Sequence, residues 1–185
     1  MTRIIVLRMG HRIPRDWRLT THVCLTARAM GADGVVVSDI EDKEVQAKVR
    51  GVVERFGGDF SIQTGTPWRD VIRGWKDAGG IVVHLTAYGL PLPKVVDEIR
   101  ETKRDVLVVV GAEKVPGELF GLADRNVSIT NQPMSEVAAL AVFLDWFQLH
   151  GEFDRDFRNS RIRIVPSKAG RHIEEEPADE KNVRQ

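Results

Sequence analysis

The sequence predicts an α/β fold with a mainly parallel six-stranded sheet and helices on both faces of that sheet. Short β-branched apolar runs recur along the chain, and continuous runs of this kind are typical of strands that are covered on both faces. A stretch with helical periodicity follows each run, and this alternation indicates a parallel sheet. The six runs read RIIVLR, GVVVSD, DFSIQT, GIVVHL, DVLVVVG and NVSIT.

Local signals support the starts of three of the predicted helices. Asp42 is a residue type that caps helix N-termini, and Pro67 and Pro133 suit a first helical turn, where a missing N–H costs nothing. The predicted helices cover residues 17–30, 42–56, 67–78, 93–103, 116–123 and 134–148.

The 185 residues suffice for one domain with its own core and a small appendage. We expect the main domain to cover residues 1–148. After Trp146 the alternation of strand and helix stops, and RIRIV is one short candidate strand. We therefore expect an appendage over residues 149–172, which could form a short hairpin. A disordered acidic tail is expected over residues 173–185.

The charges balance over the whole chain but not along it. Lysine plus arginine and aspartate plus glutamate both number 27, so no global field favours a polyanionic partner. Residues 3–28, however, contain six arginines and Asp16 as their only acid. Such a local basic face could bind phosphate, although scattered solvated arginines explain it equally well.

A single cysteine, Cys24, excludes a disulfide framework and a cysteine-based metal site, and we predict no metal ligands. The apolar run at the N-terminus is too short for a signal peptide, and no later run approaches the length of a membrane span. We therefore expect a cytoplasmic protein without a membrane partner.

Polar loops follow the last three strands, where ligands bind in open α/β sheets. These loops read HLTAYG, GAEKVP and TNQPMSE, and their backbone donors and acceptors suit a nucleoside with an amino-acid tail. The loop after the first strand lacks the G-x-G-x-x-G of dinucleotide-binding folds. Asp39, just after the second strand, could nevertheless take the place of the acid that binds the ribose in such folds. A small Rossmann-like oxidoreductase therefore stays open as a minor alternative.

The segments VVVGAEKVPGEL and NVSITNQPMSEVAALAVFLD resemble the paired cofactor motifs of the SPOUT class of RNA methyltransferases. That resemblance implies a C-terminal deep trefoil knot around S-adenosylmethionine. The segment LRMGHRIPRDWRLTTHVCLTARAMGADGV is similar to archaeal tRNA 2′-O-ribose methyltransferases that act on cytidine 56 in the T-loop. The resemblance covers residues 3–148, and it extends to about residue 170 when the appendage is included. It implies S-adenosylmethionine as cofactor, tRNA as substrate and a homodimer.

The same resemblance implies which residues line the cofactor pocket. They are Leu85 and two loop segments, one after the fifth strand and one after the sixth. The first segment comprises Gly111, Ala112, Glu113, Lys114 and Val115, and the second comprises Ile129, Thr130, Asn131, Gln132, Pro133, Met134, Ser135 and Glu136.

The sequence departs from the family pattern at one catalytic position. Many SPOUT ribose methyltransferases carry a catalytic arginine on the first helix, and alignment on TARAMGA places Leu25 there. Arg18 and His22 share a helical face with Leu25, and Arg15 lies on the preceding loop. We expect Arg18 first, with His22 and Arg15, to serve catalysis.

A ribose hydroxyl is a poor nucleophile, and an arginine could position it and the adjacent phosphate by charge-assisted hydrogen bonds. The base could be His22, His11 or the phosphate itself. His11 and Arg12 are expected to position RNA phosphates.

Leu25 also supports an alternative from another class, a non-catalytic RNA-binding or nucleotide-binding α/β module. The helix MSEVAALAVFLDWFQL is apolar on more than one face, so it is either central to the core or half core and half dimer surface. Trp146 and Phe147 at its end favour the dimer surface.

Overall fold

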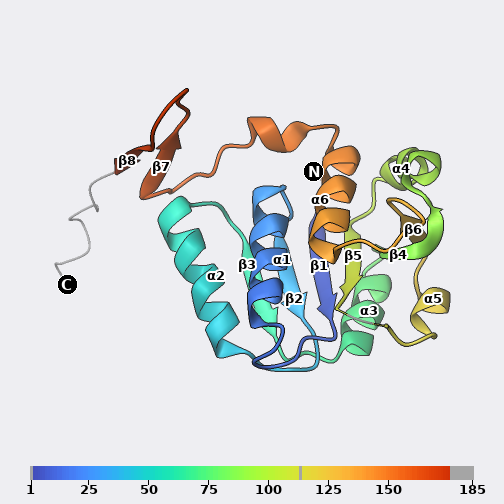
Figure 1. Cartoon of the computed structure of the whole chain (residues 1–185). Helices are drawn as coiled ribbons and strands as arrows, with labels where there is room; N and C mark the ends of the chain where they lie inside the picture. Colours follow the sequence, from blue (N-terminus) through green and yellow to red (C-terminus); the bar gives the residue numbers. More distant parts are fainter. Residues whose placement is uncertain (1, 113, 176–185) are drawn as a thin grey trace.

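The structure is a computed structural model that describes residues 2–112 and 114–175. Its main sheet has six strands in the order β3-β2-β1-β5-β4-β6, and all neighbouring strands are parallel (Figure 1). The predicted fold class is therefore confirmed. The strands are β1 (Ile4–Met9), β2 (Gly34–Val37), β3 (Ser61–Thr64), β4 (Ile81–Pro91), β5 (Val106–Gly111) and β6 (Arg125–Ser128).

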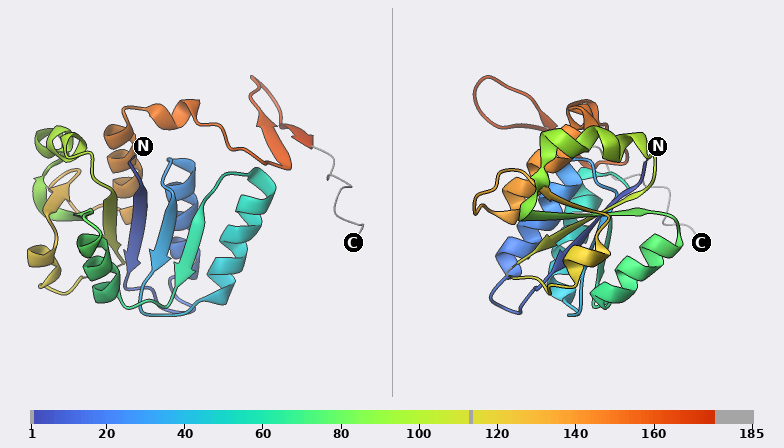
Figure 2. Two further views of the ribbon diagram at one scale, coloured as in Figure 1. Left: turned by 180° about the vertical axis from the view of Figure 1, so that it is seen from behind. Right: turned by 90° about the vertical axis from the view of Figure 1, so that its right-hand side faces the viewer.

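Helices cover both faces of the sheet, and Figure 2 shows α1 and α3 on opposite sides of it. Side chains alternate along each strand, so Ile4 and Val6 of β1 face one core cluster and Ile5 and Leu7 face the other. The first cluster packs under α1 (Trp17–Ala29), α2 (Lys43–Phe56), α4 (Leu92–Glu101) and α6 (Glu136–Gln148). The second packs under α3 (Trp68–Asp77) and α5 (Leu119–Leu122).

The helix starts follow the local signals with three adjustments, of which the first is that Pro67 is the N-cap of α3 and not a residue of its first turn. Asp42 caps α2 as predicted, because its Oδ1 accepts hydrogen bonds from Glu44 N at 3.0 Å and Val45 N at 2.9 Å. Pro133, however, lies outside α6, which Ser135 caps instead. The helix predicted over residues 116–123 is only the four-residue α5.

The end of α6 is half core and half surface. Phe147 is 7% exposed and stacks on Phe143 with ring centroids 5.8 Å apart, so it belongs to the core. Trp146 is 41% exposed. Phe147 is therefore not available for a dimer surface at this end, whereas Trp146 is, and the dimer surface itself stays a prediction.

After α6 the chain forms the short 3-10 helix η1 (Gly151–Asp154) and an antiparallel hairpin of β7 (Ile162–Val165) and β8 (His172–Glu175). Figure 1 shows this hairpin beside the end of α2, away from the main sheet. Residues 173–175, which the sequence assigned to the disordered tail, belong to β8. The rest of that tail, residues 176–185, lies outside the described residues.

Strand β4 pairs twice with the same residue of β6. Both Leu85 and Leu90 lie opposite Val127, so the intervening residues 86–89 stand out of the ladder. Asn131 Nδ2 donates to the carbonyl oxygens of Ala87 at 2.8 Å and Gly89 at 3.2 Å, which holds this bulge against the segment after β6. The predicted trefoil knot stays a prediction.

The strand order also separates this fold from the dinucleotide-binding folds. Their usual order is 3-2-1-4-5-6, whereas here β5 lies between β1 and β4. This order counts against the Rossmann-like oxidoreductase. Within the described part of the chain, no helix is long and apolar enough to cross a membrane.

We predict that Gly89→Ala destabilises the fold by about 1–3 kcal/mol, as overpacking typically does. A Cβ at Gly89 would lie 2.5 Å from backbone atoms of Val127, which cannot move without disturbing the β4–β6 ladder. Urea unfolding measures the loss. Gly121→Ala is the control, because a Cβ there meets nothing within 4 Å; equal stability of the two variants would contradict the close approach.

Candidate functional site

A cavity of about 240 Å³ opens at the carboxyl ends of β4, β5 and β6. This edge is where ligands bind in open parallel sheets. The structure brings together nine of the residues that the sequence assigned to a cofactor pocket. They are Leu85, Gly111, Ala112, Ile129, Thr130, Gln132, Pro133, Met134 and Glu136.

Four other predicted residues are described but are not among the residues that line this cavity. Lys114 is exposed to solvent. Val115 packs against the second core cluster, Asn131 holds the β4 bulge, and Ser135 caps α6. Glu113 lies outside the described residues, so the structure does not place it.

Five lining residues were not predicted from the sequence, namely Thr86, Ala87, Val110, Val127 and Ala139. Ala139 lies three residues after Glu136 on α6, and helical spacing could have indicated it. Thr86 and Ala87 belong to the HLTAYG loop, which the sequence had already singled out. Val110 and Val127 carried no signal beyond that of a buried strand, because only the strand order decides which strand ends meet.

Glu136 is held at the wall of the cavity by a buried arginine. Arg8 on β1 is 0% exposed, and its Nη2 lies 3.0 Å from Glu136 Oε1. This contact is an ion pair without hydrogen-bond alignment, because the three guanidinium nitrogens have no hydrogen-bond partner among the described residues. Burial lowers the pKa of Arg8, and the negative charges of Glu136 and Asp16 oppose that shift.

Such a pair contributes little stability in itself, since the desolvation of both charges offsets their attraction. Its effect is to fix one carboxylate at the cavity. Arg8 was not among the predicted site residues, because in RIIVLR the arginine only ends the apolar run of a strand.

His11 is buried within a chain of hydrogen bonds. Its Nε2 lies 2.8 Å from Asp42 Oδ2, and its Nδ1 lies 2.9 Å from Thr20 Oγ1. Burial alone would raise the pKa of Asp42, but hydrogen bonds from Val45 N and His11 outweigh it and hold that pKa below its usual value. These hydrogen bonds connect the loop after β1 to the starts of α1 and α2.

This position corrects the prediction that His11 contacts RNA phosphate or acts as the base. The residue is 2% exposed and both ring nitrogens are occupied, so a phosphate cannot reach it in this structure. Arg12 is half-buried, and its Nε donates to Asp16 Oδ2 at 2.9 Å.

The three catalytic candidates lie outside the cavity. Arg18 and His22 are exposed on α1, Arg15 is exposed on the loop before it, and Leu25 is half-buried on the same helix. None of the candidates is among the residues that line the cavity. Within one chain the structure therefore does not bring them to the cavity wall.

Asp39, the residue behind the oxidoreductase alternative, has a structural role. It adopts a left-handed backbone conformation with φ of 68°. Its Oδ1 accepts a hydrogen bond from Trp68 N at 3.2 Å, and its Oδ2 accepts one from Ser38 Oγ at 2.6 Å. Asp39 thus caps α3.

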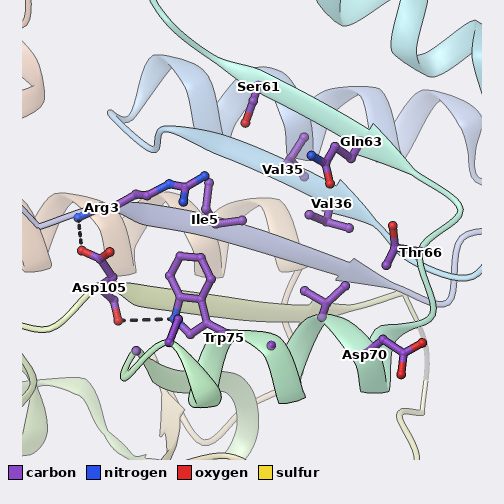
Figure 3. A pocket seen from close by; sticks show the side chains of 14 residues that line it. Arg3, Ile5, Val35, Val36, Ser61, Gln63, Thr66, Asp70, Trp75 and Asp105 are labelled. Carbon is purple, nitrogen blue, oxygen red and sulfur yellow. Dashed lines mark hydrogen bonds between the residues drawn. The ribbon is translucent and has the colours of Figure 1, made fainter.

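A larger cavity of about 430 Å³ lies between α3 and the sheet (Figure 3). Asp105 lies at one end of it, where its Oδ1 accepts from Arg3 N at 2.8 Å and its carbonyl oxygen accepts from Trp75 Nε1 at 3.3 Å. The smaller cavity remains the better candidate site, because three loops from the carboxyl ends of strands converge there.

Solved structures show the class of this fold. The A. aeolicus TrmH/SpoU tRNA modifying enzyme superposes with a TM-score of 0.60 at 17% identity, covering 83% of this chain and 78% of that one. The SpoU methyltransferase AviRb from Streptomyces viridochromogenes, in complex with AdoMet, gives a TM-score of 0.56 at 18% identity, covering 78% of this chain and 56% of that one. The fold is that of the SpoU methyltransferases.

Sequence comparison narrows the class to a family. Residues 56–174 match the family model described as "tRNA ribose 2'-O-methyltransferase, aTrm56". A tRNA (cytidine(56)-2'-O)-methyltransferase of Methanopyrus kandleri is 54% identical over 172 residues, which cover 93% of this chain and 96% of the relative. The chain belongs to the tRNA ribose 2′-O-methyltransferase family.

We predict an asymmetry within the Arg8 and Glu136 pair. Glu136→Gln should destabilise the protein by about 3 kcal/mol, because it leaves the buried guanidinium uncompensated. Arg8→Met should cost less than about 1 kcal/mol, since Glu136 can be hydrated from the cavity. Urea unfolding of both variants measures the difference, and equal losses would contradict it.

Proposed function

We propose that this chain catalyses S-adenosylmethionine-dependent 2′-O-methylation of the ribose of cytidine 56 in tRNA. The observation that carries the proposal is the cavity at the carboxyl edge of the sheet, in a chain 54% identical over 172 residues to a tRNA (cytidine(56)-2'-O)-methyltransferase. A cytoplasmic location, where tRNA is found, belongs to the same proposal.

The lining residues fit the cofactor. Leu85 and Ile129 offer apolar surface for an adenine ring, and the backbone at Gly111 and Ala112 offers polar groups. The carboxylate of Glu136 suits the positive charge of a sulfonium. S-adenosylmethionine, when bound, supplies an electrophilic methyl group. The AdoMet complex of AviRb, a protein of the same fold, supports this assignment.

The residues of α1 would then act on the acceptor. The ribose hydroxyl has to lose its proton and be held in line with the methyl group. Arg18 and Arg15 can bind the neighbouring RNA phosphates, and His22 can accept the proton. His22 is the only one of the proposed bases on this chain that is exposed, because His11 is buried.

A homodimer would reconcile the position of α1 with the position of the cavity. The catalytic candidates lie outside the cavity of their own chain, so a second subunit could bring its α1 to that cavity. The exposed Trp146 and Leu149 offer apolar surface at the end of α6 for such a contact. The non-catalytic alternative predicts cofactor or RNA binding without transfer.

Mass spectrometry of tRNA digests tests the reaction directly. We expect one added methyl group, located on the ribose of cytidine 56, after incubation with S-adenosylmethionine and a tRNA transcript. A transcript with 2′-deoxycytidine at position 56 is the control, because it lacks the accepting oxygen. If no methyl group were transferred to the unmodified transcript or to any other tRNA, only the non-catalytic module would remain.

We predict that Arg18→Ala lowers the rate of transfer by about 100-fold, which corresponds to the loss of one charge-assisted hydrogen bond in the transition state. Affinity for S-adenosylmethionine, measured by calorimetry, should stay within a few-fold, because Arg18 does not line the cavity. Arg73→Ala is the matched control, since Arg73 is an exposed arginine of α3 on the opposite face. Unchanged turnover of Arg18→Ala would move the catalytic role elsewhere.

We also predict that Ala139→Leu weakens S-adenosylmethionine binding at least about tenfold, because the larger side chain would occupy the cavity. Ala138→Leu is the matched control, since Ala138 is the exposed neighbour on the same helix. Calorimetric titration compares the two variants. Equal affinities would place the cofactor outside this cavity.

A further inference from the structure

A second group of polar side chains lies at the other end of α6. Leu149 and His150, with φ of 55° and 63°, turn the chain back, and η1 then begins. This turn places His150 Nδ1 2.7 Å from Asp145 Oδ1. One ligand atom each from Asp145, His150 and Glu152 lies within 4.8 Å of the others.

Glu152 is the unusual member of this group. It is 7% exposed, and neither of its carboxylate oxygens has a hydrogen-bond partner among the described residues. No described lysine or arginine forms an ion pair with it, and Arg155 nearby pairs with Asp33 instead. Burial raises the pKa of Glu152, and a buried carboxylate beside a second carboxylate is costly unless one of the two is protonated or a positive charge lies between them.

We propose that Asp145, His150 and Glu152 bind one divalent transition-metal ion, with Zn²⁺ as the best fit. An imidazole nitrogen with two carboxylate oxygens is a typical three-ligand set for Zn²⁺, and water takes the fourth position. The imidazole disfavours Ca²⁺ and Mg²⁺, which prefer oxygen ligands. The carbonyl end of α6 adds a favourable partial negative charge.

The geometry needs only a small adjustment. Ligands about 2.1 Å from a tetrahedral zinc lie about 3.4 Å apart. Atoms that already lie within 4.8 Å of one another reach that spacing when side chains shift by about 1 Å. Glu152 is held in η1, so Asp145 and the exposed His150 would make the shift.

The metal would have a structural role. The ligands come from α6, from the turn after it and from η1, so the ion would tie the start of the appendage to the main domain. Glu136 stands at the first turn of the same 13-residue helix, nine residues before Asp145, which corresponds to about 14 Å along the axis. The ion therefore lies far from the cavity and does not depend on the proposed methyl transfer.

The test uses the full chain without a histidine tag, stripped with EDTA and titrated with ZnCl₂ by calorimetry. We expect one Zn²⁺ per chain and a rise of about 5–10 °C in the unfolding midpoint at a free Zn²⁺ concentration 100 times the Kd. Glu152→Gln and His150→Ala should each weaken Zn²⁺ binding at least about tenfold.

Two exposed residues provide matched controls. Asp154→Asn changes another acid of η1, and His172→Ala changes the exposed histidine of β8, so both should bind Zn²⁺ as the unaltered chain does. His150 is exposed, so His150→Ala should fold normally, and circular dichroism verifies this. The proposal would be overturned if the unaltered chain did not bind Zn²⁺, or if Glu152→Gln and His150→Ala bound it as tightly as the unaltered chain does. Either result would leave a carboxyl pair that shares a proton.

Discussion

The double pairing of β4 with β6 is the constraint on which the candidate site depends. Because Leu85 and Leu90 both lie opposite Val127, residues 86–89 must leave the ladder. Asn131 holds these residues by donating hydrogen bonds to two of their carbonyl oxygens. Leu85 and Ile129 then lie on the wall of one cavity with Gly111. A regular ladder would continue β4 past Val127 and would leave no bulge to form that wall.

The helix α6 connects this cavity with the rest of the molecule. Its first turn carries Glu136, which Arg8 holds at the cavity from the strand β1. Its middle packs Leu140, Phe143 and Leu144 into the core. Its last turn carries Asp145 and leads into the appendage. One helix, with one face packed in the core, thus connects the cavity at its first turn to η1 after its last turn.

Local chemistry explains which of the predicted site residues the structure brings together at one cavity. The loops GAEKVP and TNQPMSE follow strands whose apolar runs are unambiguous, so their place at the carboxyl edge could be inferred. The prediction for His11 failed because its neighbours Asp42 and Thr20 come from two other segments, and burial is a property of all three together. Arg8 was missed for the same reason, since its partner Glu136 is remote in the sequence.

The sequence by itself determined the six strands, the helices between them and the segments that surround the cavity. Periodicity, caps and turn residues act over a few neighbours, so these features can be read without knowing the fold. Only the tertiary structure decided that β5 lies between β1 and β4, and that Arg8 meets Glu136. Strand order and buried charge pairs depend on contacts between distant segments, and no local pattern of residues specifies those contacts.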